Sequence, residues 1–83
     1  MKILYFAWLR TTIGKSTEEI TPPETVKTVS DLLDWMPSLG ENYSSALEKR
    51  DLLRIAINQE YADPEHVIKP DDEVALFPPV TGG

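Results

Sequence analysis

The most apolar segments of this 83-residue chain lie at its two ends, and this placement constrains the fold more than any other feature. Residues 2–10 read as a strand with apolar side chains on both faces, and residues 73–77 read as another. Val74 and Leu76 should point inward from the latter. Strands that are apolar on both faces are typical of the interior of a sheet. We therefore expect the first and last strands to pair as the central strands of a mixed sheet.

A helix is predicted between these two strands. Thr28 and Asp31 have the spacing of a capping box, with an acidic residue three positions after the cap. Apolar residues then recur at helical spacing and form one stripe, made of Val29, Leu32, Leu33, Met36 and Leu39. Pro37 and Gly40 should end or distort the helix. The stripe is what a helix needs to cover one face of a sheet.

Shorter elements fill the rest of the chain. We expect strands over 16–21 and 53–58, a short strand at 61–62, a small helix or turn within 41–50, and turns near Gly14-Lys15, 64–68 and 70–72. This order predicts an α+β domain of the β-grasp (ubiquitin-like) type, with a mixed sheet of four to five strands packed on one main helix. Residues 1–79 would form this domain, and residues 80–83 a flexible C-terminal tail.

Composition narrows the chemistry. The chain has no cysteine, which excludes disulfides, cysteine-bound metals and thiol catalysis. Its net charge of −6 argues against nucleic acid and anionic membranes as partners. The charge favours a partner with a basic surface, or simply keeps a small protein soluble. The apolar N-terminal run is too short to span a bilayer and lacks a signal-peptide cleavage site, so we expect a cytoplasmic protein.

Other residues that could do chemistry have structural explanations. His66 is the only histidine, and without a base, a nucleophile or fellow ligands it makes neither a triad nor a metal site. The adjacent carboxylates Glu18-Glu19 and Asp71-Asp72-Glu73 fit a solvated strand edge and a turn, since adjacent residues on a strand point apart. We therefore predict no metal site and no bound cofactor, and an enzyme acting alone is disfavoured.

The C-terminal segment carries the most specific signal. Residues 72–83, DEVALFPPVTGG, resemble the C-terminal signature of the molybdopterin synthase small-subunit family. Ile57-Asn58-Gln59 and the opening strand through Leu9-Arg10 resemble other parts of the same family. A terminal Gly-Gly alone would be weak evidence for the family, but the segment Phe-Pro-Pro-Val-Thr before it, at the end of a chain of this length, makes the signal specific. One departure is Asp71-Asp72 where the family commonly has Gly-Asp; we expect slight backbone strain there and no change of role.

The resemblance implies that the reactive group is the C-terminal carboxylate of Gly83. An ATP-dependent adenylating enzyme would convert it to an acyl-adenylate, and a sulfur donor would then displace the nucleotide to leave a thiocarboxylate. The thiocarboxylate would give its sulfur to a pterin precursor on the large, catalytic synthase subunit, building the dithiolene of the molybdenum cofactor. The chain would be the non-catalytic sulfur-donor subunit of a heterotetramer, and only the activating partner would use ATP.

The length and composition of the tail suit it to carry Gly83 into the active site of a partner. Val80, Thr81 and Gly82 are expected to thread into a narrow channel, because the extended segment to Gly83 reaches about 13 Å and glycines allow close approach. Pro78-Pro79 should stiffen the base of the tail, which lowers the entropy lost on threading.

Aromatic residues near the tail predict a docking patch. The even-numbered face of the first strand begins and ends with a basic residue, so we take it as the outer face. Phe6 and Trp8 would then lie beside Phe77, and with Pro78 and Pro79 they would form a surface for partner docking. The alternative is that one or two of these aromatic residues belong to the core.

Three classes of function remain open at this point. The first is the sulfur carrier of molybdopterin synthesis. The second is a sulfur carrier of another pathway, such as thiamine thiazole synthesis or tRNA thiolation, or a ubiquitin-like protein modifier. The third is an interaction module with an inert tail. All the carriers share the terminal Gly-Gly, whereas the Phe-Pro-Pro-Val-Thr lead-in favours the first.

Overall fold

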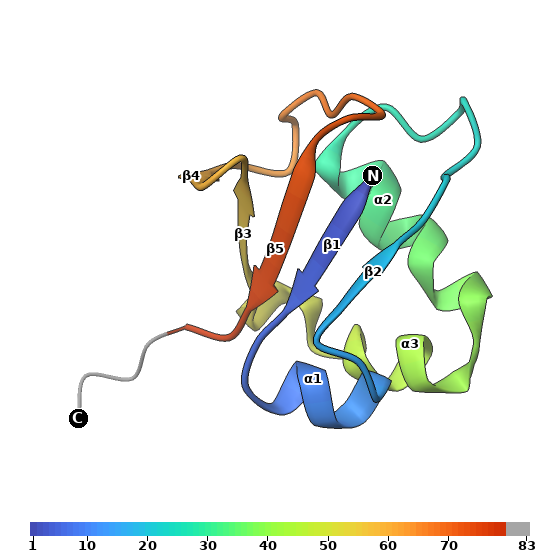
Figure 1. Cartoon of the computed structure of the whole chain (residues 1–83), viewed down its shortest axis with the longest axis vertical. Helices are drawn as coiled ribbons and strands as arrows, with labels where there is room; N and C mark the ends of the chain where they lie inside the picture. The colour runs from blue at the N-terminus through green and yellow to red at the C-terminus, as the bar shows by residue number, and fades with distance from the viewer. Residues whose placement is uncertain (80–83) are drawn as a thin grey trace.

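A computed structural model describes residues 1–79, and its centre is a mixed sheet with strand order β2-β1-β5-β3-β4 (Figure 1). The strands are β1 Lys2–Tyr5, β2 Thr17–Glu19, β3 Arg54–Ile57, β4 Glu60–Tyr61 and β5 Glu73–Phe77. The helices are α1 Trp8–Ile13, α2 Val29–Trp35 and α3 Glu41–Ala46, with 3₁₀ turns η1 Met36–Leu39 and η2 Arg50–Leu52. None of these helices is long and apolar enough to cross a membrane.

The two ends of the domain meet at the centre of the sheet. β1 and β5 pair in parallel, with Ile3 beside Val74 and Tyr5 beside Leu76. β2 adds to β1 and β3 adds to β5, both antiparallel. The predicted β-grasp architecture is confirmed, including the central position of the first and last strands. The strands expected within 16–21, 53–58 and near 61–62 are also present.

The core lies between one face of the sheet and α2, which passes behind the strands in Figure 1. Ile3, Val74 and Leu76 point into it from the central strands and are fully buried. Leu32 and Met36 meet them from the helical side and are also fully buried. Each such side chain contributes about 1.5–3 kcal/mol by leaving water. The predicted helical stripe is therefore core from Val29 to Met36, whereas Leu39 is 38% exposed because the chain leaves the α-helix for the η1 turn before it.

The N-terminus of α2 has the predicted capping box. Thr28 Oγ1 accepts a hydrogen bond from the Asp31 amide at 3.1 Å, and Asp31 Oδ2 accepts one from the Thr28 amide at 3.2 Å. The Lys27 amide also donates to Asp31, and it is the main cause of the lowered pKa of that carboxyl. Pro37 lies in the 3₁₀ turn that follows α2, and Gly40 ends that turn with a φ of 154°, so the predicted distortion is confirmed.

The first strand is shorter than predicted. It ends at Tyr5, and residues 8–13 form helix α1 instead of the end of a strand and a turn. The chain reverses at Ala7, whose φ is 56°, and the Leu9 amide donates to the Phe6 carbonyl at 3.2 Å. Leu9 and Ile13, four residues apart, are then both buried. In a helix residues four apart lie on one face, so Leu9 and Ile13 enter the core together from α1, and this tertiary contact overrides the local strand pattern.

The turn before β5 is not strained in the expected way. Within residues 1–79, the non-glycine residues with positive φ are Ala7, Asn58 and Gln59, so the strain predicted at Asp71-Asp72 is wrong. The Asp72 carboxylate instead accepts hydrogen bonds from the Lys69 amide at 2.8 Å and from Asn58 Nδ2 at 2.9 Å. These bonds hold the turn without a left-handed residue.

Candidate functional site

The segment predicted to carry the chemistry follows directly from β5. This strand is paired on both sides, with β1 up to Leu76 and with β3 up to Phe77. Pro78 and Pro79 come next and are half-buried. The predicted reactive residue Gly83, and the threading residues Val80, Thr81 and Gly82, lie outside the described residues. The structure therefore fixes the base of this segment at the end of a central strand.

One face of the sheet is not covered by the helices, and we call it the outer face. Strand register places its residues in rows across the sheet. The first row is charged and contains Glu19, Lys2 and Glu73. The second is largely apolar and contains Leu4, Ala75, Ala56 and Tyr61. The last contains Arg54 and Phe77, so the apolar side chains of the outer face gather toward the end of β5, with the charged Arg54 beside them.

Three aromatic residues, Phe6, Tyr61 and Phe77, form a cluster at this apolar end, and we call them the aromatic cluster. The rings of Phe6 and Phe77 meet edge to face, with centroids 6.3 Å apart. The rings of Tyr61 and Phe77 are 5.9 Å apart. Phe6 is 41% exposed and Tyr61 is 76% exposed. Exposed aromatic residues gathered in one patch are typical of a protein-docking surface.

Tyr61 was not among the predicted docking residues, although its position has a sequence signal. Asn58 and Gln59 both have positive φ, as a two-residue hairpin turn requires. Such a turn places Tyr61 opposite Ala56. The Asn-Gln pair before a short strand could therefore have assigned Tyr61 to the outer face.

Trp8 occupies a different place from the one predicted. It begins helix α1 rather than lying on the outer face of the first strand, and it is 42% exposed. Among residues 1–79, its ring makes no pair with Phe6 or Phe77. The predicted pairing of Phe6 with Phe77 is confirmed, whereas the inclusion of Trp8 on that strand face is wrong because the chain turns at Ala7.

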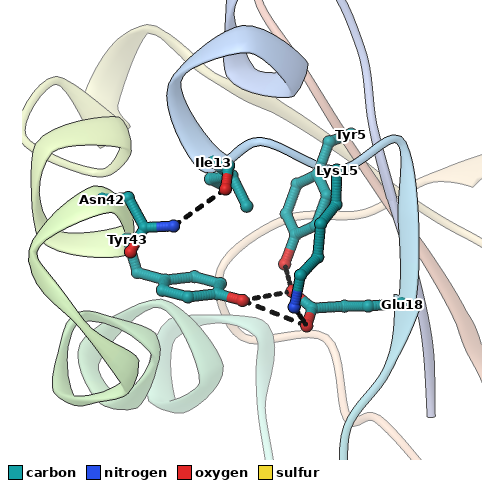
Figure 2. Close-up of polar contacts among 6 residues, drawn as sticks. All are labelled: Tyr5, Ile13, Lys15, Glu18, Asn42 and Tyr43. Carbon is teal, nitrogen blue, oxygen red and sulfur yellow. Dashed lines mark hydrogen bonds and ion pairs between the residues drawn. The ribbon is translucent and has the colours of Figure 1, made fainter.

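A second cluster of polar groups surrounds Glu18 (Figure 2). Its carboxylate accepts hydrogen bonds from the Tyr5 hydroxyl at 2.6 Å, the Tyr43 hydroxyl at 2.8 Å and Lys15 Nζ at 3.1 Å. The predicted solvated edge is wrong for Glu18, whose side chain is only 13% exposed. The prediction of a solvated edge does fit Glu19, which faces the other way and is 77% exposed.

The electrostatics of this cluster assign it a structural role. Burial alone would raise the pKa of Glu18, but the hydrogen bonds from Tyr5, Tyr43 and Lys15 outweigh it and lower the pKa. Burial is the main cause of the raised pKa of both tyrosines, so their hydroxyls stay protonated as donors. An ionised carboxylate engaged by three donors is not available as a general base. The cluster instead ties β1, β2 and α3 together.

The described residues contain no other set of groups suited to catalysis. Within residues 1–79, no three His, Cys, Asp or Glu side chains lie close enough to hold a metal ion. His66 is exposed in the loop before β5. The aromatic cluster and the end of β5 are thus the features from which a function can be argued.

Comparisons with known proteins agree with this geometry over the whole chain. The model of the ThiS family matches residues 3–83. The molybdopterin synthase sulfur carrier subunit of Escherichia coli is 37% identical over 83 residues, which cover 100% of this chain and 99% of that protein. The subunit of the same name from Homo sapiens is 29% identical, with 100% and 93% covered.

Solved structures show the same fold. SAMP1 from Haloferax volcanii superposes with a TM-score of 0.74 at 33% identity, covering 100% of this chain and 98% of that one. A putative molybdopterin converting factor, subunit 1, from Pyrococcus furiosus has a TM-score of 0.69 at 31% identity, with 95% of each chain covered. The resemblance inferred from the C-terminal segment is confirmed, and this chain belongs to the ThiS family.

Proposed function

We propose that this chain is the sulfur-carrier subunit of molybdopterin synthase. The Gly83 carboxylate attacks ATP on an adenylating enzyme, and pyrophosphate leaves. A sulfur donor then displaces AMP from the acyl-adenylate and leaves a thiocarboxylate. On the large catalytic subunit, the thiocarboxylate sulfur passes to a pterin precursor, and water returns the terminus to a carboxylate. The chain supplies the sulfur and no catalytic residues.

The observation that carries this proposal is the end-to-end match to sulfur carrier subunits. The family model extends to residue 83, and the Escherichia coli relative matches the entire chain. The match therefore includes the terminal Gly82-Gly83, where the chemistry would take place. The fold supports it further, because a central strand paired on both sides gives this segment a rigid base.

The same proposal assigns the outer face to partner docking. The aromatic cluster lies at the end of β5, next to the segment that must enter the partner's active site. Burying these rings against the large subunit supplies binding energy beside the tail, where it also positions the terminus. Pro78 and Pro79 lead from this surface into the tail. We place the reaction in the cytoplasm, where ATP for adenylation is available, with two copies of this chain on a dimer of large subunits.

Intact-protein mass spectrometry tests the proposal. The chain is purified after co-expression with the adenylating enzyme of its host, and a known carrier is processed in parallel as a positive control. We expect a mass rise that matches replacement of one oxygen by sulfur, mapped to Gly83. If the terminus of this chain stays unmodified while the known carrier becomes thiocarboxylated, the carrier function is rejected.

The alternative function, that of a protein modifier, has one observation in its favour. The chain is similar to the solved SAMP1 structure at a TM-score of 0.74, and another similar structure is named a small archaeal modifier protein. A modifier would form isopeptide bonds from Gly83 to lysines of other proteins, and a carrier would not. Mass spectrometry of cell extracts for lysines that carry the C-terminal peptide of this chain, joined through Gly83, separates the two; because no Lys or Arg follows Lys69, this peptide is much longer than Gly-Gly after a tryptic digest. Deleting Gly83 separates both from an inert interaction module, which would keep its partner binding.

A further inference from the structure

An apolar groove lies at the end of the molecule away from the aromatic cluster. It is a cavity of about 570 Å³ between the chain's N-terminus, the connection from β2 to α2 and the segment before β5. Met1, Ile20 and Val26 form part of its apolar lining, and all three are only half-buried. Val67 also lines the groove and is 63% exposed. No residue of the aromatic cluster lines it.

The groove is held open by hydrogen bonds that do not depend on a partner. The Met1 ammonium donates to the Ile20 carbonyl at 3.0 Å, and the Ile20 amide donates back to the Met1 carbonyl at 2.9 Å. The Ile68 amide donates to the Lys27 carbonyl at 2.9 Å. Pro22, Pro23 and Pro70 add wall segments of fixed φ. A preformed site of this size loses little entropy when a ligand enters.

The charge at the groove differs from the charge of the whole chain. Lys27 and Lys69 both line it, and of the ion pairs within residues 1–79 none involves either. Glu24 is the one acidic residue in the lining. The chain as a whole has a net charge of −6. Two exposed lysines beside an apolar lining therefore make this part of the surface less acidic than the chain as a whole.

We propose that this groove binds a short segment of a partner protein that carries apolar side chains flanked by carboxylates. The apolar side chains would cover Val67 and the exposed parts of Met1, Ile20 and Val26. The carboxylates would pair with Lys27 and Lys69. Nucleic acid does not fit the site, because two cations cannot offset the acidic surface around them.

The position of the groove gives the interaction a consequence. In Figure 1 the connections into α2 and into β5 meet at one end of the sheet, and β5 ends at the other. The antiparallel bridge between Thr28 and Val67 places those two connections side by side. A short segment bound in the groove therefore leaves the aromatic cluster, which includes Phe77, uncovered. The chain can be held by this partner while another protein engages its C-terminal end, whatever the chemistry of that end.

Panning a phage library of random short peptides on the full-length chain tests the proposal. We expect enrichment of peptides with an apolar centre and flanking Asp or Glu. When one of the enriched peptides is synthesised and added to the chain, the amide chemical-shift changes should map to residues around Val67 and Ile20. The variant Lys27→Gln/Lys69→Gln should bind that peptide about tenfold more weakly, as loss of two ion pairs predicts. Val67→Ser should weaken binding similarly.

The matched control is Arg10→Gln/Lys49→Gln, which removes the same charge from exposed basic residues outside the groove; it should keep the parent affinity. Circular dichroism confirms that each variant is folded. The proposal is overturned if no acidic-apolar peptide is enriched, or if the enriched peptides map to the aromatic cluster. It is also overturned if both double variants weaken binding equally, or if sedimentation shows that a second copy of the chain fills the groove.

Discussion

At the scale of single residues, Glu18 binds side chains 13 and 25 positions away in the chain. It lies on the edge strand β2, yet its carboxylate joins Tyr5 of β1 to Tyr43 of α3. Each of these hydrogen bonds involves a charged acceptor, which makes it stronger than a bond between neutral groups. A single carboxylate thereby fixes how α3 packs against the sheet edge.

Replacing Glu18 with Gln should lower stability by about 1–3 kcal/mol at pH 7, because buried hydroxyl donors lose a charged acceptor. The folded protein holds the pKa of Glu18 below its ordinary value. Its contribution is therefore complete above the unfolded pKa, about 4.3, and is lost as pH falls through the lower folded pKa. The gap between wild type and Glu18→Gln should narrow below about pH 4.

Urea denaturation at pH 7 and at pH 3.5 measures this gap. Glu19→Gln is the matched control, since Glu19 is the exposed neighbour on the same strand and should change stability little. Equal losses for Glu18→Gln and Glu19→Gln would show that the network around Glu18 contributes nothing of its own.

Phe77 is the residue on which docking should depend most. It contacts both other members of the aromatic cluster and directly precedes Pro78-Pro79. Phe77→Ala should weaken binding to the large subunit more than tenfold, on the order of 2 kcal/mol, as central aromatic anchors do. Leu39→Ala, at an exposed apolar residue in η1, should bind normally. Unchanged affinity of a folded Phe77→Ala chain, measured by calorimetry, would remove the outer face from the docking proposal.

At the scale of elements, α2 owes its start to side chains rather than to helix propensity. It has only seven residues, which is too short to persist alone in water. The capping box fixes its first turn, and its buried stripe holds it on the sheet. Thr28→Ala should therefore cost about 1 kcal/mol, read as a lower urea midpoint at unchanged slope.

The control for this change is Ser30→Ala in the same turn, where no side-chain hydrogen bond is lost. Ala at that position should be neutral or slightly stabilising. If Thr28→Ala and Ser30→Ala are equally tolerated, the cap does not define the start of α2.

At the scale of the whole molecule, the parallel pairing of β1 with β5 joins the two ends of the domain. Ile3 lies at the centre of this pair and is fully buried, whereas Leu4 points to the outer face and is half-buried. Ile3→Ala should cost about 2–5 kcal/mol, a large share of the stability of a small domain. Leu4→Ala should cost about 1 kcal/mol.

Thermal and urea unfolding followed by circular dichroism compare these two variants. One cooperative transition is expected for both, because the core is shared by the sheet and α2. Loss of only part of the structure in Ile3→Ala would contradict a single core organised around the central strands.

Much of this protein follows from short-range patterns. The capping box at Thr28, the helical stripe after it and the apolar end strands each specify their own local structure, and together they predicted the β-grasp fold. The family could likewise be inferred from the sequence, because the Phe-Pro-Pro-Val-Thr-Gly-Gly motif is continuous in the chain. Local propensity and burial pattern suffice where every interaction that matters lies within a few residues.

Tertiary structure decided the positions that depend on contacts between distant residues. Trp8 and Leu9 read as strand, but the core accepts Leu9 together with Ile13, and so the chain turns at Ala7 into a helix. The sequence predicted a solvated Glu18, but the fold brings the hydroxyls of Tyr5 and Tyr43 within hydrogen-bond distance of its carboxylate. Tyr61 joined the aromatic cluster because the register of β3 and β4 brought it to Phe77. Packing selects among the local alternatives, since burial of a side chain stabilises more than the preference it overrides.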